Sequence, residues 1–347
     1  MQIRQWFSAN RWFFNKAKEI DRDSPESLTK YKLAEYVLAT TPDWAKDIPY
    51  QIKRCAIFDY WKAKMNAIRK YKKTNEVQEI HFRSIKNPCQ SCYIPKSAVK
   101  KLGVYYTKLG KLIATEPLET EMDSRIVCKR GRYYLTVGKK ENQRRESQAA
   151  GIVAIDPGVR TFITFYAGDC CGKLGEQDIQ RIYRLCLHLD KLIGKRSLER
   201  NHRKRVNMKR AIWRLRNKIN DLVEELHHKV ALFLCSNFKT ILLPSFESKL
   251  MTEKDKRKIT TPIARKMLTL SHYRFKKFLQ HKADEMGVEV IEVSEAYTSK
   301  TCSWNGKIKE IGGAKWIRDG KTAVDRDYNG ARGIMLRALR DNSLSVA

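Results

Sequence analysis

Three acidic residues stand where a predicted strand ends or a predicted helix begins: Asp156, Glu295 and Asp327. Strand ends of one sheet lie side by side, so carboxylates that are far apart in the sequence can converge there. Converging carboxylates suit phosphodiester hydrolysis, because they can hold two Mg²⁺ ions that activate water and stabilise the leaving oxygen. Taken singly, each acid fits a turn or a solvated ion pair better.

Apolar periodicity indicates which elements would position these acids. Buried or half-buried strands are predicted at 152–155, 161–166, 239–243 and 288–293. Helices are predicted at 212–233, where apolar residues recur at spacings of three and four, and at 264–286 and 331–341. Asp156 then lies at a strand end, within an α/β domain that occupies 151–347.

Two modules with different residue patterns precede this domain. Residues 1–80 show helical periodicity, with aromatic side chains among many Lys and Arg. Residues 81–145 hold short β-rich runs, and 129–132 predicts the turn of a hairpin. We therefore expect a basic helical module, a small β-rich module and an α/β domain, in that order.

The charge of the chain indicates a polyanionic partner. The formal net charge is +32, from 70 Lys and Arg against 38 Asp and Glu, which favours nucleic acid. A membrane surface fits less well, because the basic residues are spread along the chain. No apolar run is long enough to span a membrane or to serve as a secretory signal. Nine cysteines, with Cys170 and Cys171 adjacent, argue against a disulfide framework. We expect a soluble, intracellular protein.

The basic residues that we expect to contact nucleic acid fall into two groups. Those in the helical module are Arg11, Lys62 and Arg69, which lie among aromatic residues. The other group lies in an arm at 191–218, which holds twelve Lys or Arg and one acid, Glu199. The predicted contacts in the arm are Lys195, Arg196, Arg200, Arg203, Lys204, Arg205, Lys209 and Arg210.

Three motifs occur in the order found in a known family. The stretch 156–162 resembles the first RuvC motif of TnpB and its Fanzor relatives, 295–302 resembles the segment that leads into their zinc ribbon, and 325–332 resembles their last RuvC motif. The segments 242–247 and 272–275 are also similar to Fanzor sequences. The similarity spans nearly the whole chain.

The resemblance implies a RuvC (RNase H-like) nuclease core with the N-terminal helical and β-rich modules as accessories. It implies a mobile-element-associated, RNA-guided DNA endonuclease with guide RNA and target DNA as partners and two Mg²⁺ ions at one site. Asp156 carries over as the first metal ligand and Asp327 as the last. A helical insertion at 177–237 would lie against the guide–target duplex. The location would be the nucleus in a eukaryotic or viral setting and the cytoplasm in a prokaryotic one.

The middle metal ligand departs from the usual TnpB pattern, which places a glutamate at the end of the strand that here reaches Pro244. Fanzor-like members use a relocated glutamate, and we predict Glu295 in this role. Glu247 is the reserve. Asp325 is a second reserve, which we expect to support Asp327.

The zinc ribbon is also incomplete. Of two expected Cys-x-x-Cys knuckles only Cys302 is present, and one thiolate cannot hold a structural zinc ion. We therefore predict no zinc and a degenerate remnant at 302–324, packed around Trp304 and Trp316. Cys89 and Cys92 form a Cys-x-x-Cys elsewhere, in a segment that we expect to be a strand with packing roles. The family usually begins with a strand that this sequence lacks before its first predicted helix.

Two other functions stay open at this stage. One is a catalytically impaired RNA- and DNA-binding relative, which the missing ribbon cysteines favour. The other is an unguided, structure-selective nuclease or a transposition accessory that keeps an active centre. The sequence does not distinguish a monomer from a dimer.

Overall fold

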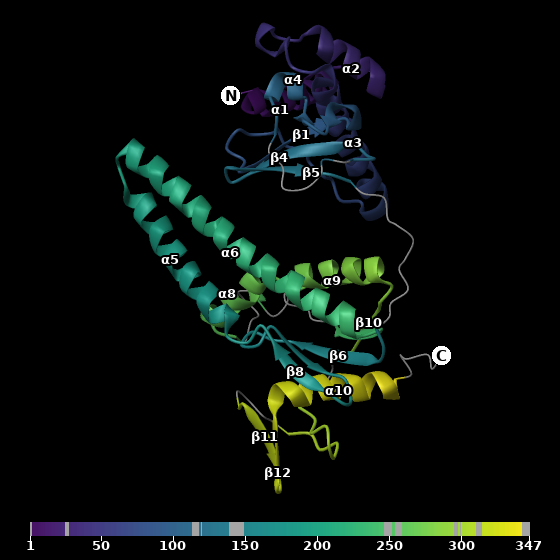
Figure 1. The fold of residues 1–347 in the computed structure, drawn as a ribbon. Coiled ribbons are helices and arrows are strands. Elements are labelled where there is room, and N and C mark those ends of the chain that lie inside the picture. Colours follow the sequence, from purple (N-terminus) through teal and green to yellow (C-terminus); the bar gives the residue numbers. More distant parts are fainter. Residues whose placement is uncertain are drawn as a thin grey trace. The chain divides into compact units, whose positions relative to one another are not determined.

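The computed structural model describes residues 2–24, 28–112, 118, 120–138, 149–245, 252–253, 259–294, 298, 300–309 and 314–341. The chain divides into two compact units, residues 1–140 and 141–347. Separate sets of buried apolar side chains form the cores of the two units. Each unit therefore folds around side chains from its own elements, and Figure 1 labels those elements.

Unit 1 combines helices with a small antiparallel sheet. Its helical elements are α1 (Gln2–Asp23), α2 (Lys30–Ala39), η1 (Asp43–Ala45), α3 (Tyr50–Thr74), η2 (Lys96–Ala98) and α4 (Tyr106–Leu109). Strands β1 (Cys89–Ile94), β4 (Ser124–Lys129) and β5 (Arg132–Thr136) form a sheet in the order β1-β4-β5, and β2 (Val99–Lys100) pairs with β3 (Gly103–Val104).

The helices and the sheet of unit 1 share one hydrophobic core. Phe13 of α1, Ile57 of α3 and Ile94 of β1 are all buried in it. Residues 1–80 and 81–145, which were predicted as separate modules, thus contribute to the same core.

The hairpin predicted in unit 1 is confirmed. Strands β4 and β5 pair, and Arg130 and Gly131 between them have positive φ angles of 50° and 81°. Such angles are typical of a two-residue hairpin turn. On β1, Cys89 is exposed and Cys92 is buried. Residues three apart on a strand face opposite sides, so these two thiols cannot ligate one metal ion.

Unit 2 is built on a five-stranded mixed sheet. Its strands are β6 (Ile152–Pro157), β7 (Ile163–Tyr166), β8 (Cys171–Leu174), β9 (Thr240–Pro244) and β10 (Glu289–Val293), and the spatial order is β10-β9-β6-β7-β8. Strands β6, β7 and β8 pair antiparallel, whereas β9 pairs parallel with both β6 and β10. This confirms the predicted hairpin after Asp156 and the two later strands.

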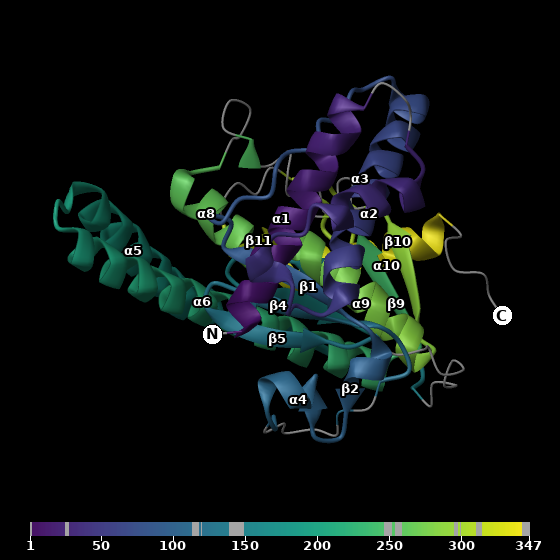
Figure 2. The ribbon, with the colours of Figure 1, turned by 90° about the horizontal axis from the view of Figure 1, so that it is seen from above.

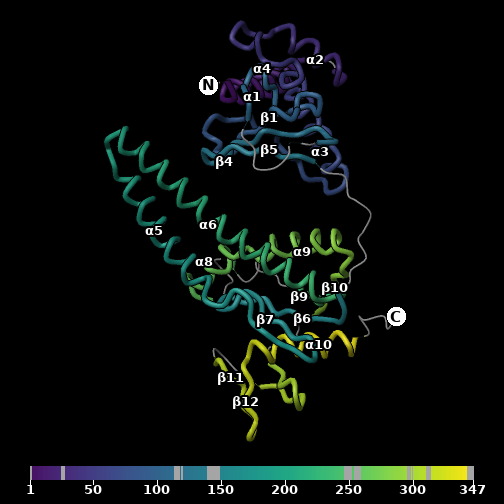
Figure 3. Tube along the Cα trace, viewed as in Figure 1, coloured from purple at the N-terminus to yellow at the C-terminus, as the bar shows by residue number. Residues whose placement is uncertain are grey.

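Helices cover both faces of this sheet (Figure 1, Figure 3). The helices are α5 (Asp178–Leu198), α6 (His202–Asn237), α8 (Thr261–Leu270), α9 (His272–Met286) and α10 (Arg326–Arg340). Alternation along β6 separates the faces: Val153 and Ile155 join the core with α5, α6, α8 and α9, whereas Ala154 joins the core with α10. Asp156, two residues after Ala154, therefore faces α10.

Two further features project from the sheet of unit 2. Helices α5 and α6 run alongside each other as a long hairpin whose tip carries the predicted basic arm (Figure 2). Strands β11 (Trp316–Asp319) and β12 (Thr322–Asp325) form a small hairpin directly before α10. No helix within the described ranges is long and apolar enough to cross a bilayer.

Candidate carboxylate site on the sheet of unit 2

Asp156 lies at the end of the central strand, next to the first turns of α10. A Cβ atom placed on Gly330 of α10 would overlap Oδ2 of Asp156. The absence of a side chain at Gly330 is therefore what lets the carboxylate approach the helix backbone. Asp327 stands one helical turn before Gly330, on the same side of α10. The structure thus brings the neighbourhoods of two of the predicted ligands together.

The two carboxylates of the Asp-Arg-Asp sequence, Asp325 and Asp327, differ in their contacts. Asp325 is buried and caps α10, because its Oδ1 accepts the N–H of Asp327 at 2.9 Å. Its Oδ2 accepts a hydrogen bond from Lys173 at 2.8 Å. Among the described residues, the side chain of Asp327 forms no hydrogen bond or ion pair, so its oxygens remain available to a ligand.

The electrostatics of this corner favour the ionised form of Asp325. Burial alone would raise the pKa of Asp325, but the hydrogen bonds from Lys173 and from the Asp327 N–H outweigh it and lower that pKa. Burial would lower the pKa of Lys173, but its bond to Asp325 and the charges of Asp325 and Asp327 raise it. Asp325 and Lys173 are therefore both charged near neutral pH.

For the predicted middle acid, the structure describes only the strand that precedes it. Glu295 and Glu247 lie outside the described residues. Strand β10 ends at Val293, which pairs with Pro244 at the end of β9. Because β6, β9 and β10 run parallel, all three end at the edge of the sheet that carries Asp156. The residues just before Glu295 therefore reach the correct edge.

The donor set fits a hard divalent cation such as Mg²⁺. Carboxylate oxygens are the side-chain ligands that Mg²⁺ prefers, and one or two of them usually suffice beside water and substrate oxygens. No three His, Cys, Asp or Glu side chains gather at one point in the part of the chain described above. Asp156 and Asp327 are thus the candidate ligands among the described residues.

A stack of aromatic rings supports the loop that follows Asp156. The rings of His227 and His272 both stack on Phe162, with centroids 5.3 and 5.1 Å away. Both histidines are buried, and burial lowers the pKa of each to about 4. They are therefore neutral at pH 7 and pack as aromatic rings. Sequence analysis missed this pair, since nothing in the sequence links α6 and α9 to residue 162.

Polar contacts hold the described parts of the segment that was predicted as a ribbon remnant. Cys302 is buried, and the backbone N–H groups of Asn305 and Gly306 donate to its carbonyl oxygen, which keeps a tight turn. Asn305, at the second cysteine position of a knuckle, donates to Asp319 of β11, and Lys309 donates to Asp319 at 2.6 Å. A carboxylate thus links the two segments that a zinc ion would join in a complete ribbon.

The predicted packing around both tryptophans of the remnant is wrong for Trp316. Trp316 is 49% exposed, whereas its neighbour Ile317 is 1% exposed. Alternation along β11 places one of the two side chains inward, and the structure places Ile317 there. Asn329 of α10 joins the remnant to the helix through hydrogen bonds with Thr301 and Ser303.

Asp319→Ala is expected to loosen this remnant in a way that zinc cannot restore. The substitution removes the acceptor shared by Asn305 and Lys309, so amide hydrogen exchange should quicken in 300–309 and 316–325 in zinc-free buffer with a chelator. Asp319→Asn keeps an acceptor oxygen and serves as the matched control. Slower exchange in the unsubstituted protein after zinc is added would contradict the prediction of a metal-free ribbon.

The predicted nucleic-acid contacts of the arm lie on the surface. All eight are exposed apart from the half-buried Arg196. None of them forms an ion pair with a carboxylate among the described residues. By contrast, cations nearer the sheet, such as Lys229 and Arg274, are paired with glutamates. The tip of the α5–α6 hairpin therefore presents positive charge that the described protein does not neutralise.

The start of α6 carries cations where they are unfavourable. Asn201 caps the helix, and Arg203, Lys204 and Arg205 follow in the first turn without any acid. The N-terminus of a helix has a partial positive charge, so each cation there costs a few tenths of a kcal/mol or more, roughly. A bound polyanion would offset this repulsion.

The three basic residues predicted in unit 1 differ in their surroundings. Lys62 and Arg69 are exposed and seven residues apart, hence on one side of α3. Arg11 is half-buried and donates to Ser8 and Gln90, and burial lowers its pKa because no carboxylate compensates.

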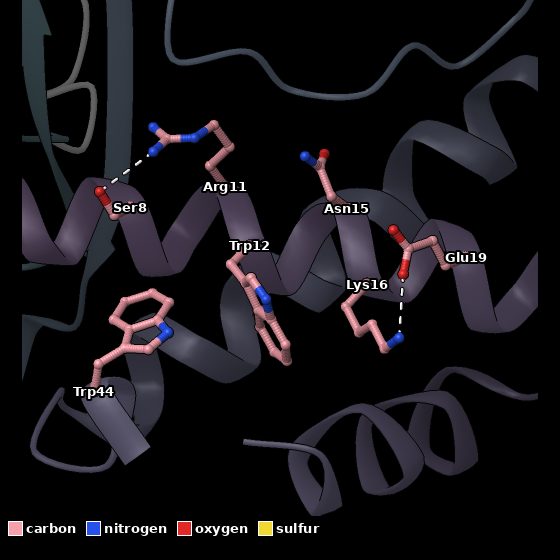
Figure 4. Close-up of a pocket in the computed structure, with 7 residues that line it drawn as sticks. All are labelled: Ser8, Arg11, Trp12, Asn15, Lys16, Glu19 and Trp44. Atoms are coloured by element: carbon pink, nitrogen blue, oxygen red, sulfur yellow. Dashed lines mark hydrogen bonds and ion pairs between the residues drawn. The ribbon is translucent and has the colours of Figure 1, made fainter. Parts of the chain in front are cut away.

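Arg11 also lines a pocket of about 290 Å³ between α1 and η1 (Figure 4). Trp12 and Trp44 project toward this space, and Trp44 is 48% exposed. Lys16 also lines it, paired with Glu19 at 3.1 Å. An exposed indole ring such as that of Trp44 can stack on a base, and cations beside it can contact phosphates.

The chain is similar to one protein family and to several viral proteins. Residues 272–334, from α9 into α10, match the family described as Cas12f1-like, TNB domain. A putative transposase of Acanthamoeba polyphaga mimivirus is 30% identical over 199 residues, which are 55% of this chain and 41% of that protein. A TnpB-like protein of the same virus is 29% identical over 212 residues, 59% of this chain and 40% of its own length. The chain thus covers less than half the length of these viral relatives.

Two other comparisons cover almost all of the chain. The putative RNA-guided DNA endonuclease InsQ of Escherichia coli is 24% identical over an alignment of 366 positions, which covers 96% of this chain and 88% of that protein. Among solved structures, a Cas12f1 protein in complex with sgRNA and target DNA aligns with a TM-score of 0.50 at 13% identity, over 96% of this chain and 81% of that one. At this identity the likeness concerns the fold.

Proposed function

We propose that this chain, which belongs to the TnpB family, is an RNA-guided DNA endonuclease with one hydrolytic site formed by Asp156, Asp327 and Glu295. The approach of Asp156 to Gly330, one turn after Asp327, carries the proposal. The two acids are 171 residues apart in the sequence, and the contact of Asp156 with Gly330 brings the strand of one next to the helix of the other.

The proposed core is of the RuvC (RNase H-like) type. The three antiparallel strands, the two parallel strands and the helices on both faces support it. Two Mg²⁺ ions, when bound, would activate water and stabilise the leaving oxygen. The residues of the chain have separate tasks: Asp156 and Asp327 bind the cations, Glu295 supplies the third carboxylate, and Gly330 leaves space for Asp156.

Guide RNA and target DNA are the proposed partners. The net charge of +32 and the cations at the tip of the α5–α6 hairpin, which form no ion pair among the described residues, support them. Relatives described as an RNA-guided endonuclease and as an sgRNA–target DNA complex point the same way. Base pairing with the guide would choose the sequence, while the protein would contact the backbone of the duplex.

One experiment tests the proposed function. The protein is purified with its RNA, the RNA is sequenced, and DNA matched to it is incubated with the complex and Mg²⁺. We expect cleavage of matched DNA and none of a scrambled sequence. Cleavage of branched DNA without RNA would instead support an unguided nuclease. Binding without any cleavage would support a catalytically impaired relative, which the ribbon without a complete cysteine set favours.

Neutralising the tip of the α5–α6 hairpin is expected to weaken nucleic-acid binding. In the variant Arg203→Gln, Lys204→Gln and Arg205→Gln, lost phosphate contacts should reduce the dependence of log affinity on log salt by up to about one per residue. Filter binding over a range of salt concentrations measures this slope.

A matched triple of substitutions controls for net charge. Lys229→Gln, Arg274→Gln and Lys282→Gln remove the same charge from cations that are already paired with glutamates. We expect this control to keep most of the affinity and the salt slope. Equal losses in the two triples would show that overall charge, not the hairpin tip, determines binding.

A further inference from the structure

A lysine that sequence analysis did not single out lies at the edge of the carboxylate site. Lys173 belongs to β8, its side chain is 13% exposed, and Nζ donates to Oδ2 of Asp325 at 2.8 Å. The ammonium group also lies 5.0 Å from the centre of the Tyr328 ring. Ionic and cation–π contacts thus hold this side chain in one place.

The register of the sheet aligns Lys173 with Asp156. Asp156 on β6 pairs with Thr164 on β7, and Thr164 pairs with Lys173 on β8. Directly paired residues project from the same face, so Lys173 and Asp156 share the face that α10 covers. The two residues are two strand spacings apart, about 10 Å between Cα atoms. Lys173 therefore flanks the acids on the side of β8.

A chain of contacts connects Lys173 to Asp327. Lys173 donates to one oxygen of Asp325, and the other oxygen of Asp325 accepts the backbone N–H of Asp327. The orientation of the Asp325 carboxylate therefore determines where α10 begins. The start of α10 in turn determines where Asp327 stands relative to Asp156.

We propose that Lys173 is a positioning residue of the carboxylate site, which acts through Asp325 to place Asp327 and adds a fixed positive charge beside the metal ligands. The part of this proposal that concerns cleavage rests on the proposed function, whereas the part that concerns metal binding does not. A buried salt bridge with no role at the site would contribute little to stability by itself.

The effect of this charge on metal binding distinguishes a positioning role of Lys173 from a role in stabilising the fold only. A cation beside the ligands repels a divalent metal ion, so its removal should strengthen metal binding. Its removal should also let the Asp325 carboxylate turn, which shifts Asp327 out of the position that cleavage requires while leaving it within reach of the metal ion, so cleavage slows. A lysine that only stabilised the fold would weaken metal binding and cleavage together when it is removed.

Lys173→Met and Lys173→Arg test this split in the full chain. Mn²⁺ binding is followed by the electron paramagnetic resonance of free Mn²⁺ without DNA, and cleavage by single-turnover rates at saturating Mg²⁺. In Lys173→Met we expect Mn²⁺ binding about fivefold tighter. The cleavage rate should fall about 10- to 100-fold, as is usual when a group that orients a metal ligand is lost. Lys173→Arg should restore both values most of the way.

Lys276 offers a matched control on the other face of the same sheet. Its Nζ lies 2.6 Å from Oε2 of Glu292, and its side chain is 22% exposed while that of Glu292 is 47% exposed, so it is a partly buried lysine paired with a more exposed carboxylate. Lys276→Met should change neither Mn²⁺ affinity nor the cleavage rate. Combining Lys173→Met with Asp325→Asn should slow cleavage little beyond Asp325→Asn alone, because both substitutions act through one contact.

Several results would overturn the proposal. Weaker Mn²⁺ binding by Lys173→Met, an unchanged cleavage rate, or rate losses that multiply in the double variant would each do so. An unsubstituted protein that binds no Mn²⁺ would also overturn it. An unsubstituted protein that binds Mn²⁺ but cuts no matched DNA would refute the proposed function, and tighter Mn²⁺ binding by Lys173→Met would then still support the fixed charge at the site.

Discussion

Replacing Asp156 with asparagine is expected to abolish DNA cleavage while nucleic-acid binding stays at the unsubstituted level. The amide keeps the size of the carboxylate but removes the charge that a divalent metal ion requires, and a bound metal ion stabilises the transition state by several kcal/mol. We expect the single-turnover rate to fall about 10³-fold or more, which corresponds to about 4 kcal/mol. Time courses on the RNA-bound protein at saturating Mg²⁺ measure this loss.

Other aspartates of unit 2 sharpen this experiment. Asp327→Asn should match Asp156→Asn, because both carboxylates are proposed to bind the same cations. Asp169→Asn, in the exposed turn between β7 and β8, changes the same chemistry away from the site and should cleave normally. Cleavage by Asp156→Asn within about tenfold of the unsubstituted rate, roughly 1.4 kcal/mol, would exclude this carboxylate as a metal ligand.

Lowering the pH from 6.5 towards 4 is expected to destabilise unit 2 through His227 and His272. Burial lowers the pKa of each from 6.5 to about 4. Below pH 6.5 the unfolded chain takes up protons that the folded chain accepts only near pH 4, so the free energy of unfolding falls as the pH falls through this window. Each histidine contributes up to about 3 kcal/mol to this fall.

His272→Phe isolates one of the two contributions. Phenylalanine keeps an aromatic ring beside Phe162 but does not titrate, so the free energy of unfolding should fall less steeply between pH 6.5 and pH 4. Urea denaturation at a series of pH values measures the slope. His281→Phe makes the same substitution at an exposed histidine of α9 and should leave the slope unchanged. An unchanged slope in His272→Phe would refute the assignment.

Local pattern was sufficient for β6, β7, β9 and β10 and for the placement of Asp156 at a strand end, but not for β8, β11 or β12. Residues 152–155 are continuously apolar, and a turn and a β-branched run follow them. The hairpin of β6 and β7 can therefore be predicted from about fifteen consecutive residues. The helices of 212–233 and 264–286 follow equally from the 3.6-residue period. The break between α8 and α9 did not follow from it. Ser271, with a positive φ of 53°, separates them there although no glycine or proline marks the place.

The packing of unit 1 was not accessible from its sequence. The change from helical periodicity to short β-rich runs near residue 80 indicated two modules. Cys92 and Ile94 of β1 are nevertheless buried with side chains of α1 and α3. Composition reports local preferences, whereas a shared core depends on which apolar faces meet. The same reason explains Trp316, since a strand of four residues gives no sequence signal for which face turns inward.

The sequence by itself indicated the candidate acids, the basic arm and the likeness to TnpB and Fanzor proteins, because each depends on residues that are close together in the chain. Only the tertiary structure decided that Gly330 lies against Asp156, that Lys173 flanks the same acids and that two neutral histidines support Phe162. These contacts depend on strand register and on helices packed across a sheet, and both are set by apolar surfaces that meet over long sequence distances. The candidate acids could therefore be predicted from the sequence, whereas the groups that contact them could not.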